Sequence, residues 1–311
     1  MRVFVAGASG AVGRPLVPRL VAAGHEVTGT TRSHEKAEGI RAAGATPVVV
    51  DALDAAGLRE AVVAASPEVV VHELTALPDR FQPRRKDIYA ATNRVRSEGT
   101  RNLLEAAGAA GVRRFVCQSI AFACAPRERP EVLDEAAPLN LDAPAPFGEG
   151  VEVIAEMERA VTGADGVEGL VLRYGWFYGP GTYYAEDGSS AADVRKRRFP
   201  VIGDGTGLFS FVHVDDAAAA TVAAVERGAP GIYNVVDDEP AAMRDWLPAY
   251  AEAIGAPPPR RVPVWLARLI AGKMVAELNR QPGASNAKAR RELGWEPRWR
   301  SWREGFREAP R

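Results

Sequence analysis

The sequence predicts an α/β protein with a doubly wound parallel sheet and a smaller C-terminal lobe. Three observations predict this class. Over the first 120 residues, short β-branched runs alternate strictly with alanine- and leucine-rich stretches. The strand candidates are nearly continuous in apolar residues, as strands covered on both faces are. Glycines also recur at every third position directly after the first strand candidate. Alternating strands and helices imply parallel strands joined by right-handed crossovers.

The expected elements follow one another in a regular order. The expected strands in the first part of the chain are RVFVAG (2–7), HEVTGTT (25–31), TPVVVD (46–51), EVVVHEL (68–74) and RRFVCQS (113–119). The expected helices between them cover residues 14–23, 34–43, 54–65 and 84–109. After a surface loop rich in proline and acidic residues (125–150), we expect a helix over 151–162, the strand GLVLRYG, and a strand–helix–strand unit over 210–238.

We divide the chain into two parts on this basis. Residues 1–175, together with about 209–238, are expected to form a Rossmann-type nucleotide-binding domain, and residues 176–208 and 239–311 a substrate-binding lobe. A length of 311 residues is enough for both.

Composition and charge exclude several classes of protein. The net charge of −1 favours neither nucleic acid nor an anionic membrane as a partner. Cys117 and Cys124 are the two cysteines, too few for a disulfide framework, and no metal-ligand spacing is present. The most apolar late segment, 263–278, is too short and too charged to span a bilayer. We expect a cytoplasmic protein that binds a small-molecule substrate and no metal.

The segment GASGAVG at positions 7–13 is a candidate phosphate-binding loop. Backbone N–H groups can approach a phosphate only where no Cβ intervenes, and the following helix adds a positive partial charge. A tight glycine turn without a ligand would have the same spacing. The residues expected to hold the cofactor here are Gly7, Ser9, Gly10, Val12 and Gly13.

The end of the second strand predicts which dinucleotide is bound. NAD-binding proteins usually place an acid there to hold the ribose 2′-hydroxyl, whereas this chain has Thr30, Thr31 and Arg32. A guanidinium suits a 2′-phosphate, so NADPH is favoured over NADH, unless Arg32 is a solvated loop residue. Asp51, with Ala52 after it, is expected to meet the adenine amino group or to cap the helix starting near Leu53.

The chain resembles the extended short-chain dehydrogenase/reductase family, in its epimerase/dehydratase branch. The resemblance rests on segments in family order: GASGAVG, VVVDALD, VVHELTAL, TNRVRSEGTRNLLEAA, RRFVCQS, VLRYGWFYGPGT, FSFVHVDDAAAA, YNVVDDEP and SNAKARRELGWEP. It implies a Rossmann fold, a nicotinamide cofactor and a possible homodimer through helices 84–109 and 151–162. It further implies that Leu74 and Ala76 line the cofactor, and that the stretch containing Tyr174, Trp176 and Phe177 faces the nicotinamide.

The family's acid–base pair is missing from this sequence. In the family, a Tyr-x-x-x-Lys pair on the helix after the fifth strand moves the proton, and a Ser or Thr at the end of that strand holds the substrate oxygen. Ser119 matches the latter position, but Phe147 and Val151 align with Tyr and Lys. No alignment shift repairs this, because the chain has no Tyr over 90–173 and no Lys over 87–195.

These features predict an NADPH-dependent ketoreductase of an aromatic or polycyclic metabolite with an atypical site. Ser119 would hold the carbonyl, and a tyrosine of the substrate lobe, Tyr183, is a replacement proton donor. Two alternatives remain open: a nucleotide-sugar epimerase or dehydratase, and a non-catalytic NADP-sensing or scaffold protein. His213, Asp215 and Asp216 are expected to be structural, with an Asp as a helix N-cap.

Overall fold

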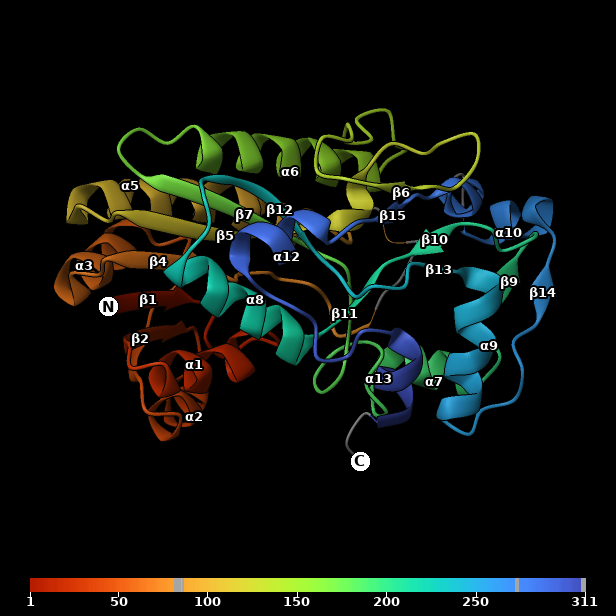
Figure 1. Cartoon of the computed structure of the whole chain (residues 1–311), viewed down its shortest axis with the longest axis horizontal. Helices are drawn as coiled ribbons and strands as arrows, with labels where there is room; N and C mark the ends of the chain where they lie inside the picture. The colour runs from red at the N-terminus through yellow and green to blue at the C-terminus, as the bar shows by residue number, and fades with distance from the viewer. Residues whose placement is uncertain (81–84, 86, 272–273, 309–311) are drawn as a thin grey trace.

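A seven-stranded parallel sheet forms the centre of the molecule (Figure 1), which confirms the predicted α/β class. The structure, a computed structural model, describes all residues except 81–84, 86, 272–273 and 309–311. The strand order is β12-β7-β5-β4-β1-β2-β3. The strands are β1 (Arg2–Ala6), β2 (Glu26–Thr31), β3 (Thr46–Val49), β4 (Val69–His72), β5 (Arg114–Ile120), β7 (Glu168–Tyr174) and β12 (Gly231–Val235). The order reverses between β1 and β4, and in such sheets ligands bind in the crevice at this reversal.

Helices cover both faces of this sheet. In Figure 1, α6 runs along the top of the view, while α1 and α2 lie at its lower left. One face carries α1 (Gly13–Ala22), α2 (His34–Ala42), α8 (Val214–Glu226) and α12 (Ala287–Leu293); the other carries α3 (Ala55–Ala65), α5 (Thr100–Ala110) and α6 (Phe147–Thr162). A separate apolar core lies between the sheet and each helix layer, and these cores fix the carboxyl ends of the strands relative to the helices.

A smaller lobe follows at the carboxyl end of the sheet (Figure 1), around a separate aromatic core that includes Phe211, Trp246, Tyr250 and Trp302. Its short strands are β8 (Trp176–Tyr178), β9 (Val201–Ile202), β10 (Leu208–Phe209), β11 (Phe211–His213), β13 (Ala241–Ala242) and β14 (Arg261–Val262). Its helices are α7 (Ser189–Arg195), α9 (Met243–Ala253), α10 (Val264–Ala271), α11 (Met274–Glu277) and α13 (Trp302–Glu308). A further pair, β6 (Val132–Leu133) with β15 (Gly283–Ala284), ties the long loop to the C-terminal part. The domain boundaries given above stay a prediction.

Two expected helices differ from the observed ones. The helix expected over 84–109 starts at residue 90 and is divided into α4 (Ala90–Arg94), a π-helical turn η1 (Val95–Gly99) and α5; residues 84 and 86 lie outside the described residues. The helix expected from 151 starts at Phe147, so Glu149 lies in its first turn and not in a loop. The sequence did not indicate this earlier start, because the glycines at 148 and 150 have a low helix propensity.

Candidate functional site

The glycine loop joins β1 to α1 at the reversal point of the sheet. Gly7 has a φ of +97°, and a Cβ on it would lie 2.8 Å from the Glu73 carbonyl oxygen. A Cβ on Gly13 would lie 2.2 Å from the Gly7 carbonyl oxygen. Val12, at the N-cap of α1, makes no side-chain capping bond, and the first turn contains no acid. Arg14 N donates to the Gly10 carbonyl and Pro15 has no N–H, so a dinucleotide pyrophosphate at this helix start would be held by loop N–H groups that precede Arg14.

A pocket of about 340 Å³ opens beside this loop at the end of β2. It is lined by Ser9, Thr31, Arg32, Ser33 and Lys36. Three hydroxyl groups and two cations thus converge without a carboxylate among them. Ser9 Oγ donates to Thr31 Oγ1 at 3.1 Å, and Ser33 caps α2 by accepting from Lys36 N. Lys36 was missed in the sequence, although its place in the first turn of α2, four residues after Arg32, could have indicated it.

Asp51 and Ala52 lie beyond the end of β3. Asp51 is exposed, and its Oδ1 accepts from Leu53 N at 2.9 Å. The residue that caps α3 is Asp54, whose side chain accepts from Gly57 N, so a capping role for Asp51 is wrong. Ala52 is buried, and its carbonyl accepts from Asn102 Nδ2. A contact of Asp51 with the adenine stays a prediction.

The segment after β4 is held by hydrogen bonds on both sides. Leu74 N donates to His72 Nδ1 at 3.2 Å, and the Leu74 carbonyl accepts from Gln118 Nε2 at 2.8 Å. Ala76 N donates to Thr92 Oγ1 at 3.1 Å. Leu74 N would also lie 3.2 Å from a Cβ of Gly7. That Leu74 and Ala76 line the cofactor stays a prediction.

Tyr174 does not stand free at the crevice. It is fully buried, and its hydroxyl donates to Glu73 Oε1 at 2.9 Å and contacts Thr221 Oγ1 at 2.7 Å. Burial raises the pKa of Glu73 to about 8, and Glu73 Oε2 is buried without a hydrogen-bond partner among the described residues. Glu73 is therefore neutral at pH 7 and adds no negative charge beside the phosphate-binding loop.

The buried carboxyl of Glu73 predicts a pH-dependent stability. Because the folded pKa is raised from 4.5 to about 8, the folded state holds a proton that the unfolded state releases above pH 4.5, so stability falls as the pH rises to 8. Glu73→Gln cannot titrate, and its free energy of unfolding relative to the wild type should increase by about 3 kcal/mol from pH 5 to pH 8. Urea denaturation at both pH values measures this difference. The exposed Glu60→Gln is the control, and its difference in free energy of unfolding from the wild type should be the same at both pH values. The same result for Glu73→Gln would refute the assignment.

Ser119 lies at the end of β5 but faces α6. It is 1% exposed, and its Oγ donates to Glu158 Oε1 at 2.7 Å. Glu158 in turn forms a two-bond ion pair with Arg173, at 2.8 and 2.6 Å. The hydroxyl of Ser119 is thus engaged in a buried network that joins α6 to β5 and β7.

Aromatic side chains form a wall between the sheet and the smaller lobe. Trp176 stacks on Phe122 with ring centroids 4.0 Å apart, and both rings are partly exposed. Phe177 turns the other way and packs against Tyr174 and the core of the sheet. Trp176 and Phe177 therefore do not face one ligand together. Phe122, which no sequence pattern indicated, supplies half of a flat apolar surface.

Tyr183 joins the smaller lobe to the segment after β4. It is half-buried, and its hydroxyl donates to the carbonyl of Pro78. The ion pair between Arg80 and Asp193 of α7 makes a second link between the same segments. Gly181 lies against Arg14 at the start of α1. The structure thus places the loop around Tyr183 over the crevice.

The remaining polar clusters are structural. His213 Nδ1 accepts from Asp215 N and so caps α8, while Asp216 accepts from the N–H groups of Arg298 and Trp299. The expectation that an Asp caps this helix is therefore wrong. Within the described residues, no group of three His, Cys, Asp or Glu side chains is placed to hold a metal ion. Among the described helices, none combines the length and apolar character needed to cross a membrane.

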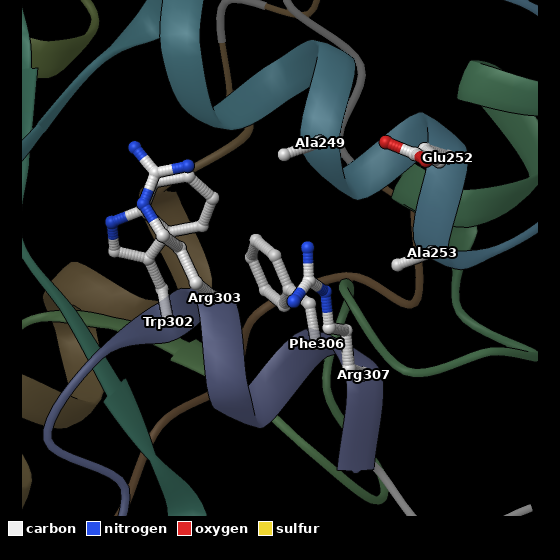
Figure 2. Close-up of a pocket in the computed structure, with 7 residues that line it drawn as sticks. All are labelled: Ala249, Glu252, Ala253, Trp302, Arg303, Phe306 and Arg307. Carbon is white, nitrogen blue, oxygen red and sulfur yellow. The ribbon is translucent and has the colours of Figure 1, made fainter.

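A second pocket, of about 200 Å³, lies between α9 and α13. Figure 2 shows Trp302, Arg303 and Phe306 projecting from α13 toward the small side chain of Ala249 on α9. Arg303 covers the Trp302 ring at 4.2 Å and pairs with Glu239. None of the predicted site residues lines this pocket.

The fold and the glycine loop define the class of the protein: a Rossmann-fold enzyme that uses a nicotinamide dinucleotide. The model of the NAD dependent epimerase/dehydratase family matches residues 3–235, and the chain belongs to this family.

Known relatives agree with this membership. A 3-diazoavenalumate denitrifying reductase from a Streptomyces species is 52% identical over 310 residues, covering 98% of this chain and 99% of the relative. A 4-hydroxy-2-methyl-3-oxo-4-farnesyl-3,4-dihydroquinoline-1-oxide ketoreductase from Stigmatella aurantiaca is 29% identical and covers 82% and 74%. The structure is similar to a UDP-glucose 4-epimerase from Thermus thermophilus in complex with NAD, with a TM-score of 0.74, 26% identity, and 99% and 97% coverage. The chain is therefore an NAD(P)-dependent reductase.

Proposed function

We propose that this enzyme uses NADPH to reduce an aromatic diazo carboxylate with release of N2. The relative that is 52% identical along nearly the full length of both chains is named for such a reaction. The partly exposed, stacked rings of Phe122 and Trp176 suit a flat aromatic substrate.

One observation carries this proposal: the buried face of α6 offers no free proton donor. Its buried residues are Gly148, Gly150, Val151, Ile154, Met157, Glu158 and Val161. Glu158 is the one ionisable member, and it is paired with Arg173. Phe147, aligned with the family's tyrosine, packs its ring edge against Tyr89. A reaction that needs hydride but no proton is compatible with such a helix.

Removal of an aromatic diazo group that reacts as the diazonium cation meets that condition. When bound, NADPH supplies a hydride, which carries two electrons. On the substrate, a C–H bond forms with that electron pair, the C–N bond breaks, and its electron pair departs with N2. No proton enters this balance. A ketone instead becomes an alkoxide and must be protonated, usually by a positioned acid.

The residues of the chain would act by binding and orientation. Gly7, Gly10 and Gly13 would hold the pyrophosphate, and Arg32 with Lys36 the 2′-phosphate. Asp51 would meet the adenine, and Leu74 and Ala76 would line the dinucleotide. The loop around Tyr183 would exclude water from the reacting atoms. A homodimer through α5 and α6 stays a prediction.

A ketone is the second candidate substrate, favoured by the name of the relative that is 29% identical. Ser119 would then hold the carbonyl and Tyr183 would supply the proton. Both hydroxyls would have to leave their present acceptors, Glu158 Oε1 and the Pro78 carbonyl. A nucleotide sugar fits less well, because the wall formed by Phe122 and Trp176 is aromatic and offers few groups for sugar hydroxyls.

Nitrogen release tests the proposal. The protein is incubated with NADPH and nitrogen-15-labelled 3-diazoavenalumate, and labelled N2 and consumed NADPH are measured together. We expect equal amounts of both, above a protein-free control that corrects for spontaneous decomposition. Turnover of a ketone from a parallel panel without N2 release would establish the second candidate instead, and no turnover of either would refute the proposal.

A further inference from the structure

Arg96 is a buried cation without a counter-ion among the described residues. It lies in the π-helical turn η1, between α4 and α5, and is 7% exposed. Its Nε is buried without a hydrogen-bond partner, and no ion pair of Arg96 occurs within the part of the chain that the structure describes. A π-helical turn inside an α-helix is frequently found at functional sites.

The groups around Arg96 do not neutralise it. Its electrostatic neighbours are Tyr89, Cys117 and His72. Burial lowers the pKa of His72 to about 4, so its ring is uncharged at pH 7. Burial likewise raises the pKa of Tyr89 to about 12 and that of the Cys117 thiol well above its usual value, so both keep their protons. Burial lowers the pKa of Arg96 to about 10, which leaves the guanidinium charged.

A second polar group beside Arg96 also lacks a partner. Asn93 stands three residues earlier, in α4 just before η1. Its Oδ1 is buried and makes no hydrogen bond with any described residue. This oxygen lies 3.5 Å from where a Cβ of Gly150 on α6 would be. Two groups without a partner among the described residues, a guanidinium nitrogen and an amide oxygen, thus lie three residues apart on a segment that packs against α6.

The position of this pair places it at the crevice. His72 ends β4 and pairs in register with Cys117 of β5, and Arg96 is close to both. The ring of Tyr89 contacts Phe147 at the start of α6. Tyr89 also interacts electrostatically with Tyr183 of the smaller lobe. Arg96 therefore lies where the sheet, α6 and the substrate lobe meet. The glycine loop and the pocket beside Arg32 are the proposed sites of the cofactor phosphates, which leaves Arg96 for an anionic group of another molecule.

We propose that Arg96 binds the carboxylate of the substrate. A guanidinium matches a carboxylate with two parallel charge-assisted hydrogen bonds, and an unpaired buried charge is unfavourable until such a partner arrives. The inference rests on the proposed function for the identity of the substrate as an aromatic carboxylate.

Binding of two matched probes tests Arg96 without the diazo reaction. Cinnamate and its neutral analogue cinnamamide are titrated into the protein saturated with NADP⁺. We expect the wild type to bind cinnamate at least about tenfold more tightly, as a charge-assisted pair provides. Arg96→Met should weaken cinnamate binding by about 10- to 100-fold and leave cinnamamide binding unchanged. The cinnamate affinity of Arg96→Lys should lie between those of the wild type and Arg96→Met, because lysine keeps the charge but cannot form two parallel hydrogen bonds as the planar guanidinium does.

The control is Arg94→Met on the same helix. Arg94 is exposed and paired with Glu98, so its removal should change neither affinity. Because Arg96 has no counter-ion among the described residues, Arg96→Met should also keep or raise the melting temperature. The inference is overturned if the wild type does not distinguish the two probes, or if Arg96→Met distinguishes them as the wild type does. Neither probe contains a diazo group, so their binding does not depend on the proposed reaction. If no N2 is released but the protein still prefers cinnamate, only the proposed reaction is refuted.

Discussion

Replacing Arg32 and Lys36 together by alanine is expected to weaken NADPH binding by about 100-fold, because each substitution would remove a proposed charge-assisted bond to the 2′-phosphate. NADH lacks that phosphate, so its affinity should change by less than about twofold. Both residues line the pocket beside the glycine loop with three hydroxyl groups and no carboxylate. Titration of each dinucleotide, followed by intrinsic fluorescence, measures the two affinities.

Arg41→Ala is the matched control for this pair. Arg41 is an exposed residue of α2 paired with Glu38, so its loss changes the charge but not the pocket. The NADP assignment would be wrong if the double variant lost affinity for NADH and for NADPH by the same factor. It would also be wrong if the wild type bound NADH as tightly as NADPH.

Glu158→Ala is expected to destabilise the protein by about 3–5 kcal/mol, the range for removing one partner of a buried ion pair. Glu158 and Arg173 are 5% and 4% exposed. Loss of the carboxylate leaves the Arg173 guanidinium without its ion-pair partner and the Ser119 hydroxyl without its acceptor. This network joins α6 to β5 and β7, so the damage reaches the carboxyl end of the sheet. The midpoint of urea denaturation measures the loss.

Glu156→Ala on the exposed face of the same helix is the control, and it should change stability by less than about 0.5 kcal/mol. Ser119→Ala should be milder than Glu158→Ala because the ion pair survives. A change below about 1 kcal/mol for Glu158→Ala would contradict the network's structural role.

Local patterns predicted the sheet and the phosphate loop from sequence. The alternation of strands and helices is periodic over short distances, and the requirement for Gly7 and Gly13 follows from a turn between two neighbouring elements. Arg32 could be placed because it directly follows β2. These features depend on residues close in sequence, where pattern and structure are strongly coupled.

Contacts between distant segments were not predictable in the same way. Ser119 resembled a ligand-facing residue, yet its acceptor Glu158 stands 39 residues later. Glu73 is buried, and its hydrogen-bond donor Tyr174 stands 101 residues later. Arg96 falls within the single helix expected over 84–109, and the π-helical turn that contains it is visible only in the structure. In each case the side chain's environment comes from packing, which no local pattern encodes.

The most direct test of the central claim follows the proposed reaction in D2O with NADPH of ordinary isotopic composition. The proposed site transfers hydride without a protein proton donor. The carbon that held the nitrogen should therefore carry ordinary hydrogen, and the solvent isotope effect on turnover should be near one. Deuterium at that carbon, or a turnover slowed severalfold in D2O, would show that a proton from an exchangeable group takes part and would contradict the account.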